Sequence, residues 1–330
     1  MTAFLENNHK FAFLVIPQTH VGQDFQDILE LDNGIYIFRN PPFELDKMWK
    51  NQLGEFTRRD LEEADLLIGT KLLSTNPMVQ GKETKILEIR VNHFLLALKI
   101  SGFFRCDKSP WIISGAHVEN STHIRGLTPL LPVLKIQGIP IEHIGLKRLK
   151  RTSQIHSALI EIYNNTNQCS RIKRALEAFR VGLSIESGDE KLHRFVRCIE
   201  GFIYPEEGKT RKQFKSRTEL FIGSRHHELM DLIYRMRSKV EHLHDALECL
   251  TEQIPLQEKI SKATKNTILT ESIARYCLSH FLLSKDLWTY FIDDESIKTY
   301  WKLDPKERET IWGNQLDLSI TEKSIGKELK

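Results

Sequence analysis

The sequence has few cysteines, and their spacing does not pair them. The five cysteines are Cys106, Cys169, Cys198, Cys249 and Cys277, and no Cys-x-x-Cys occurs. An odd number at such wide spacings argues against a disulfide framework and against a zinc ribbon. We therefore interpret the cysteines as small buried side chains in a reducing compartment.

Long hydrophobic runs are also missing. The N-terminus has no basic cap followed by an apolar stretch, so we expect no signal peptide. The most apolar run, Phe94 to Phe104, is interrupted by Lys99 and is too short to cross a bilayer. The sequence thus predicts a cytoplasmic protein with no membrane partner.

Neither sign of charge dominates the chain. Its 47 Lys and Arg residues nearly balance 44 Asp and Glu residues, which leaves a net charge of +3. A dedicated electrostatic DNA-binding protein is usually far more basic, so any phosphate-binding surface must be a local patch. Hydrophobic residues make up 40% of the 330 positions, which is enough for one large domain or two ordinary ones.

Residues 1–150 are expected to form a mixed α/β domain. Three short runs rich in β-branched and aromatic residues predict strands: 11–16, 34–38 and 111–113. Two segments have helical periodicity: 60–73 and 84–100. Frequent glycine and proline predict loops from residue 115 to residue 140. We find no catalytic constellation in this domain.

Residues 151–330 are expected to form an all-α bundle, because prolines become rare and long periodic segments follow one another. The predicted helices are 153–164, 169–183, 190–202, 210–222, 226–250, 271–283, 296–301 and 305–312. The predicted fold class is therefore an α+β domain followed by a helical bundle.

The predicted helix 226–250 carries an arginine and a histidine outside its apolar stripe. Arg237 and His242 are five residues apart, which separates them by about 140° around an ideal helix. They would not touch within one straight helix, whereas Arg237 and Glu241 could pair as neighbours four residues apart. On its own, an exposed arginine or histidine on a helix is ordinary.

An ordered set of motifs surrounds this pair. The segments are 174–183, 193–202, 216–223 and 232–242, followed by 273–275 and 291–297. They contain Glu200, Arg217, Tyr234, Arg237, Ser238, Lys239 and His242. This set resembles the HEPN superfamily, specifically its Apea-like branch. In that pattern a glutamate ends one helix, an arginine stands on the next, and a tyrosine precedes Arg-Ser-Lys-apolar-apolar-His.

The resemblance implies a metal-independent ribonuclease that works as a homodimer and needs no cofactor. His242 of one chain would work with Arg237 of the other, taking the 2′-OH proton or protonating the leaving oxygen. Arg237 would stabilise the charged transition state, and Ser238 would orient the pair or the phosphate. The product would be a 2′,3′-cyclic phosphate, and DNA, which lacks the 2′-OH, would not be cut.

Further residues are expected to support this site. The supporting set is Glu200, Tyr234 and His244, although Glu200 could instead be a helix carboxylate paired with Arg197. The basic run 209–217 could follow an RNA backbone or be the solvated start of a helix. The candidate RNA contacts are Arg211, Lys212, Lys215, Arg217 and Lys239. No metal is expected, because the His226-His227 and His242-x-His244 pairs lack Asp, Glu or Cys partners at zinc-site spacing.

Three positions depart from the family pattern. Arg235 stands where an acidic residue is common, Glu241 where an apolar residue is usual, and Leu243 where glycine is usual. Leu243 predicts that the helix continues past His242, and Glu241 could neutralise Arg237.

The resemblance makes an RNA endonuclease of prokaryotic defence or toxin systems the leading function. The first domain would then be the sensor or regulator, taking a regulatory partner or ligand. Glu241 and Leu243 favour the alternative of a catalytically inactive HEPN scaffold for dimerisation or RNA binding. A helical adaptor with no role on nucleic acid is a third interpretation.

Overall fold

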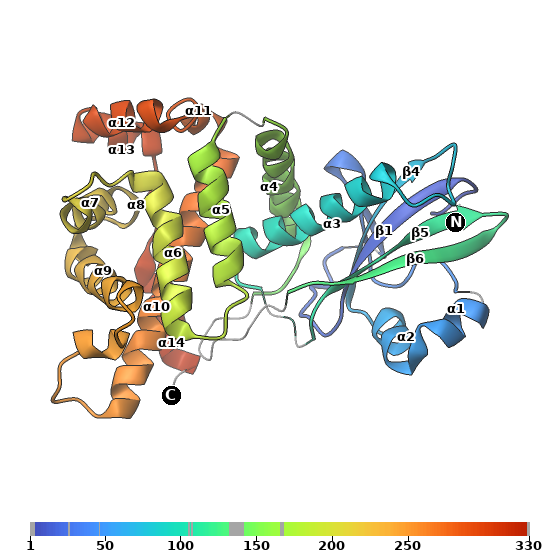
Figure 1. The fold of residues 1–330 in the computed structure, drawn as a ribbon, viewed down its shortest axis with the longest axis horizontal. Helices are drawn as coiled ribbons and strands as arrows, with labels where there is room; N and C mark the ends of the chain where they lie inside the picture. Colours follow the sequence, from blue (N-terminus) through green and yellow to red (C-terminus); the bar gives the residue numbers. More distant parts are fainter. Residues whose placement is uncertain are drawn as a thin grey trace. The chain divides into compact units, whose positions relative to one another are not determined.

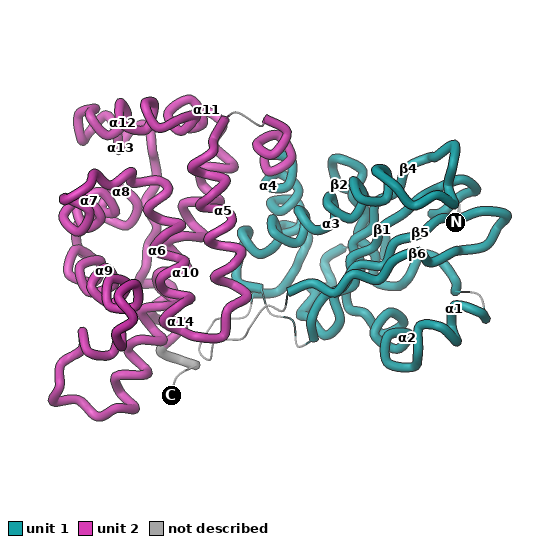
Figure 2. Tube along the Cα trace, in the orientation of Figure 1, with its two compact units in different colours: residues 1–133, 141–157 teal, residues 134–140, 158–330 magenta. Residues whose placement is uncertain are grey.

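The chain folds into two compact units. The computed structural model describes residues 4–25, 27–45, 47–104, 106, 108–131, 142–165 and 168–328. Unit 1 comprises residues 1–133 and 141–157, and unit 2 comprises residues 134–140 and 158–330 (Figure 2). The predicted boundary at residues 150 and 151 falls inside helix α4 (Leu146–Asn164).

Unit 1 is built on an antiparallel sheet with the strand order β2-β3-β4-β1-β5-β6 (Figure 1). The strands are β1 (His9–Ile16), β2 (Ile28–Leu31), β3 (Ile35–Phe38), β4 (Leu66–Leu73), β5 (Trp111–Val118) and β6 (Ser121–Pro129). Its helices are α1 (Lys47–Gln52), α2 (Gly54–Glu62), α3 (Lys82–Ser101) and the first part of α4.

Every residue of β1 is buried, because both faces of the sheet are covered. Alternate residues point to opposite faces of a strand. One face of β1, including Leu14, packs in a cluster with Val91 and Phe94 of α3. The other face, including Phe13, packs in a second cluster with Leu61 of α2. These two layers form the core of unit 1.

The predicted strands at 11–16 and 34–38 and the helix at 84–100 are confirmed as β1, β3 and α3. The predicted helix 60–73 is wrong, because α2 ends at Glu62 and residues 66–73 form β4 between β1 and β3. Periodicity alone does not separate a short strand buried on both faces from a helix.

The expected loop after Gly115 is partly wrong, because β5 continues to Val118 and β6 follows. The pairing of the two strands shifts between Ser114 and Gly115. A Cβ atom at residue 115 would overlap the backbone carbonyl of His123, so this bulge requires glycine. Residues 132–140 of the expected loop lie outside the described residues.

A buried histidine gives unit 1 a predicted sensitivity to acid. His156 is fully buried, with its ring 5.4 Å from that of Phe94 and its Nε2 atom 3.2 Å from the carbonyl oxygen of Arg90. Burial, and to a smaller extent the neighbouring His93, lowers the pKa of His156 from 6.5 to about 4. The folded protein therefore binds this proton more weakly than the unfolded chain does.

We expect the free energy of unfolding to fall as pH drops from 6.5 towards 4, because the unfolded chain takes up this proton first. The contribution of His156 to the loss between neutral pH and pH 4.5 is about 2.5 kcal/mol. Urea unfolding of the wild type and of His156→Gln at both pH values measures it. An acid-induced loss of the same size in both proteins would contradict this assignment.

The described residues of unit 2 form helices joined by turns and loops. After the end of α4 come α5 (Ser170–Gly182), α6 (Gly188–Ile203), α7 (Thr210–Arg217), α8 (Glu219–Ile222), α9 (His227–Glu241), α10 (Leu256–Leu283), α11 (Lys285–Trp288), α12 (Asp294–Lys302), α13 (Pro305–Trp312) and α14 (Leu318–Glu328). Helix α6 packs against α5, α9 and α10 (Figure 1), and α9 also packs against α7. A mixed α/β unit is thus followed by a helical one, as the sequence predicts.

Several helix ends in unit 2 differ from the prediction. The helix predicted at 305–312 is confirmed as α13, whereas α4 begins at Leu146 and α10 at Leu256, earlier than expected. The segment 210–222 forms two helices, and α9 ends at Glu241 instead of continuing to residue 250. All five cysteines are free, and all except Cys249 are buried. Across the described part of the chain, every helix is too short or too polar to pass through a lipid bilayer.

Candidate functional site

Helix α9 ends in a tight turn around His242. The backbone N–H of Leu243 donates to the carbonyl of Val240 at 3.0 Å, and that of His244 donates to the carbonyl of Lys239 at 2.9 Å. Leu243 has a φ of 60°, in the left-handed region. This is the Schellman arrangement, in which glycine usually follows the cap. The prediction that Leu243 continues the helix is therefore wrong, because the leucine adopts the turn that glycine adopts at lower cost.

Leu243→Gly should stabilise the protein. The left-handed conformation costs a non-glycine residue about 1–2 kcal/mol, and the greater chain entropy of glycine offsets part of the gain. Leu243 is 93% exposed, so its removal sacrifices little buried surface. We expect a net gain of about 0.5–1 kcal/mol in urea unfolding. Leu243→Ala keeps the Cβ atom in the turn and should not be more stable than the wild type. Equal stability of the two variants would show that residue 243 carries no backbone strain.

Arg237 lies buried between two carboxylates one turn before this cap. Its Nη1 atom donates to Glu241, four residues further along α9, and its Nη2 atom lies 3.5 Å from Oε1 of Glu200 on α6. The guanidinium also lies 5.7 Å from the centre of the Tyr234 ring. Glu200 of one motif segment thus meets Tyr234 and Arg237 of another where α6 packs against α9.

Glu200 lies at the centre of a group of guanidinium groups. Arg197 is 3.9 Å from its Oε2 atom, and Arg171 donates to its backbone carbonyl at 3.3 Å. Glu200 is buried, and this burial raises its pKa, while the charges of Arg237 and Arg197 act in the opposite direction. Glu200 thus contacts Arg197, the partner that one sequence interpretation gave it, and also Arg237 of the motif.

The remaining motif residues lie at the surface around this pair. His242 and His244 are exposed, and Ser238 is partly exposed. The backbone N–H of His242 donates to the carbonyls of Ser238 and Lys239 at 3.2 and 3.0 Å. The end of α9 thus presents an exposed imidazole five residues beyond a buried guanidinium.

Sequence reasoning did not single out His193, which also belongs to this cluster. It lies on α6 and is partly exposed, with a buried Nδ1 atom. Arg237 and Glu241 are among the charges that influence its pKa. Its spacing of seven residues from Glu200 was the available signal, because residues seven apart share one face of a helix.

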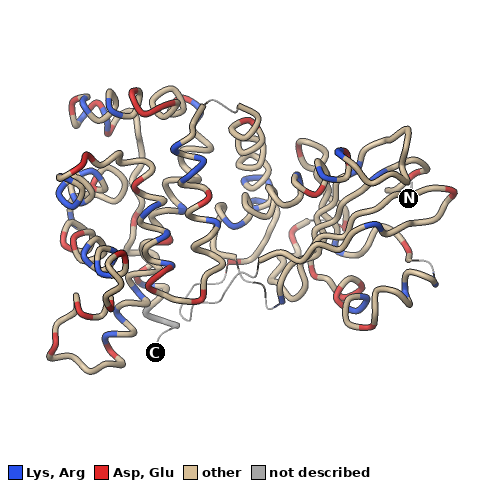
Figure 3. Tube along the Cα trace, viewed as in Figure 1, with Lys and Arg blue, Asp and Glu red and all other residues tan. Residues whose placement is uncertain are grey.

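Most candidate RNA-binding lysines and arginines are paired with carboxylates. Both Arg211 and Lys215 of α7 contact Asp231 on α9, at 2.8 and 3.7 Å. Lys239 contacts Glu248 at 2.7 Å, and Lys212 is exposed. Figure 3 shows that basic and acidic residues alternate across the helical unit. Arg211, Lys215 and Lys239 could bind RNA only by exchanging their carboxylate partners for phosphate.

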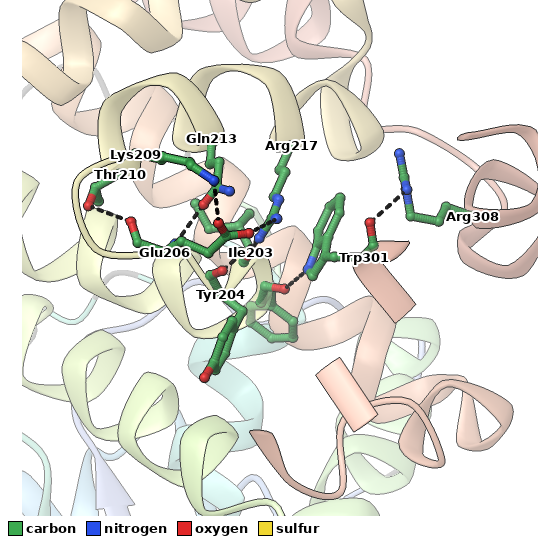
Figure 4. Close-up of polar contacts among 10 residues, drawn as sticks. Ile203, Tyr204, Glu206, Lys209, Thr210, Gln213, Arg217, Trp301 and Arg308 are labelled. Atoms are coloured by element: carbon green, nitrogen blue, oxygen red, sulfur yellow. Dashed lines mark hydrogen bonds and ion pairs between the residues drawn. The ribbon is translucent and has the colours of Figure 1, made fainter. Parts of the chain in front are cut away.

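Arg217 holds the end of α6 (Figure 4). Its Nη1 atom donates to the carbonyls of Ile203 and Tyr204 at 2.7 and 2.6 Å, and its Nη2 atom lies 3.4 Å from Glu206. Its guanidinium lies 5.0 Å from the centre of the Trp301 ring, and burial lowers its pKa. Terminal carbonyls of a helix need such donors, so the structure gives Arg217 a structural role.

The described residues form no metal-binding geometry, and no known protein matches the chain. Among the described residues, His, Cys, Asp and Glu side chains do not gather in any group of three or more that could hold a metal ion. Comparisons with protein-family models, curated proteins and solved structures find no match to this chain.

Proposed function

We propose that unit 2 is a metal-independent RNA endonuclease of the HEPN type. One observation carries the proposal: Glu200 of α6 contacts the buried Arg237 of α9, at the helix end that presents the exposed His242. The motif resemblance implies that these residues act together. Their chemistry fits RNA, whose own 2′-OH is the nucleophile, so that the enzyme supplies only proton transfer and charge stabilisation.

The residues divide this work by their positions. His242 is exposed and can reach a bound strand, where it transfers a proton. Arg237 offers a planar fork of N–H donors to the phosphate. Glu200 holds that guanidinium from behind, and Ser238 orients the phosphate. Glu241 must release Arg237 before the phosphate can bind, and 38% of its side chain is exposed.

The active form is a homodimer, in which the two helix ends face each other across a two-fold axis. His242 of one copy then works with Arg237 of the other. In this proposal the protein is a cytoplasmic defence or toxin effector that cuts RNA, and unit 1 is its sensor or regulator. The molar mass of the protein in solution tests whether it forms this dimer, independently of cleavage.

Cleavage without divalent ions tests the proposal. Purified protein is incubated in EDTA with transfer RNA and, separately, with single-stranded DNA. We expect cleavage of the RNA alone, since DNA lacks the 2′-OH. Retention of RNA without cleavage would replace the nuclease with a binding scaffold.

The contact between Arg237 and Glu241 favours that scaffold as a second candidate, because the carboxylate occupies the guanidinium. Glu241→Gln separates the two functions. In a nuclease, removing this charge frees Arg237 and should raise kcat/KM about tenfold, equivalent to about 1.4 kcal/mol. Glu258→Gln, which removes an exposed carboxylate paired with Lys262 of α10, is the matched control and should leave the rate unchanged. Absence of cleavage in both variants supports the scaffold.

A further inference from the structure

Helix α6 carries three polar side chains on one face, and two of them, His193 and Glu200, interact with α9. His193, Arg197 and Glu200 follow one another in steps of four and three, which places them on one face of the helix. Glu200 contacts Arg237 of α9 at 3.5 Å, and Arg197 lies 3.9 Å from the other oxygen of Glu200. His193 therefore belongs to the face of α6 that meets the Arg237 cluster.

His193 lies near the end of α9 that carries His242. Leu192, its neighbour in sequence, belongs to the same hydrophobic cluster as Val240 in the last turn of α9. Asp189, in the first turn of α6, interacts with the backbone N–H of Ala246, just beyond α9. The start of α6 and the end of α9 thus lie together, with one histidine on each.

The surroundings of His193 leave it able to accept a proton. The ring is partly exposed, and its buried Nδ1 atom has no hydrogen-bond partner within the described part of the chain. The charged groups that face it are Glu190 and Arg194 on α6 and Arg237 and Glu241 on α9. Burial, followed by the charge of Arg237, lowers its pKa, which favours the neutral imidazole.

We propose that His193 is a further catalytic residue, the base that takes the 2′-OH proton of the RNA. This inference rests on the proposed nuclease function. As the proton moves from O2′ to His193, O2′ forms a bond to phosphorus. The bond from phosphorus to O5′ breaks, and O5′ takes a proton from His242. In the proposed dimer, His193 acts beside Arg237 of its own chain, and O5′ takes its proton from His242 of the other copy.

The test is the pH dependence of cleavage by the full-length protein. In EDTA, kcat/KM of the wild type on transfer RNA should fall on the acid side as the base becomes protonated. In His193→Ala the rate should drop about 100-fold and this acid-side fall should disappear. Added imidazole should restore part of the rate, because it can occupy the space left by the side chain. His226→Ala, which removes a partly exposed imidazole outside the cluster, is the control and should behave as the wild type.

Two results would overturn the inference while leaving the nuclease intact. One is a His193→Ala protein with the rate and pH profile of the wild type. The other is a lower rate with an unchanged profile and no rescue by imidazole, which would make His193 structural. If His193→Ala does not fold, His193→Gln keeps a side chain of similar size. The pH dependence of its kcat/KM then tests the role of His193 in the same way. A wild type that never cuts RNA refutes the proposed function, and this inference with it.

Discussion

His242→Ala should lower the rate of RNA cleavage by about 10²–10⁴-fold, the usual contribution of a positioned acid or base. The loss should leave the fold intact, because the side chain is exposed and the cap of α9 uses the backbone of this residue. Cleavage of transfer RNA in EDTA measures the rate, and circular dichroism with urea unfolding measures the fold. We expect the cleavage rate to fall while the circular dichroism spectrum and the urea unfolding curve stay those of the wild type.

His244→Ala is the matched control for this variant. His244 is also exposed and contributes its backbone N–H to the same turn, but it lies outside the motif and is expected only to support the site. Its replacement should cost far less activity than that of His242. Equal losses in the two variants would mean that the turn, and not the imidazole of His242, is needed for cleavage.

Arg237→Ala should abolish cleavage and also destabilise the protein by about 3 kcal/mol. The stability loss follows from burial, because the variant leaves the carboxylate of Glu200 buried without its strongest opposing charge. Burial already raises the pKa of Glu200, so the folded state holds its proton more tightly than the unfolded chain does. Stability is therefore lost as pH rises from the unfolded pKa through the raised one. The defect of Arg237→Ala should be smaller at pH 5 than at pH 8.

Two companion variants separate stability from catalysis. Arg237→Ala combined with Glu200→Ala removes both charges and should recover much of the lost stability, but no cleavage. Arg237→Lys keeps a positive charge but loses the planar fork, so it should fold well and cut RNA poorly. Cleavage at the wild-type rate by any variant that lacks Arg237 would exclude this residue from the reaction.

Helix spacing predicted the local part of this site, whereas packing determined the rest. The contact between Arg237 and Glu241 follows from residues four apart on one helix. The contact between Arg237 and Glu200 depends on how α6 packs against α9, and only the motif resemblance indicated it from sequence. His193 was missed because the motif set, although one of its segments begins there, assigns this residue no role; it shares a face of α6 with Glu200.

The errors in the fold have physical causes of the same kind. Leucine seldom adopts a left-handed conformation, so no propensity indicates that α9 ends in a turn at Leu243. Strand β4 has the apolar run of a helix because both of its faces are buried. Gly115 indicated a loop, but the structure uses it where a bulge leaves no room for a side chain.

The most direct test of the central claim uses an RNA oligonucleotide with a single cleavage position. Its counterpart carries a 2′-deoxy sugar at that position alone, and both are incubated with the protein in EDTA. The account predicts cleavage of the all-ribose strand, leaving 2′,3′-cyclic phosphate and 5′-hydroxyl ends, and no cleavage of its counterpart. Equal cleavage of both strands, or cleavage only when a divalent metal is added, would contradict a site built from Arg237 and His242.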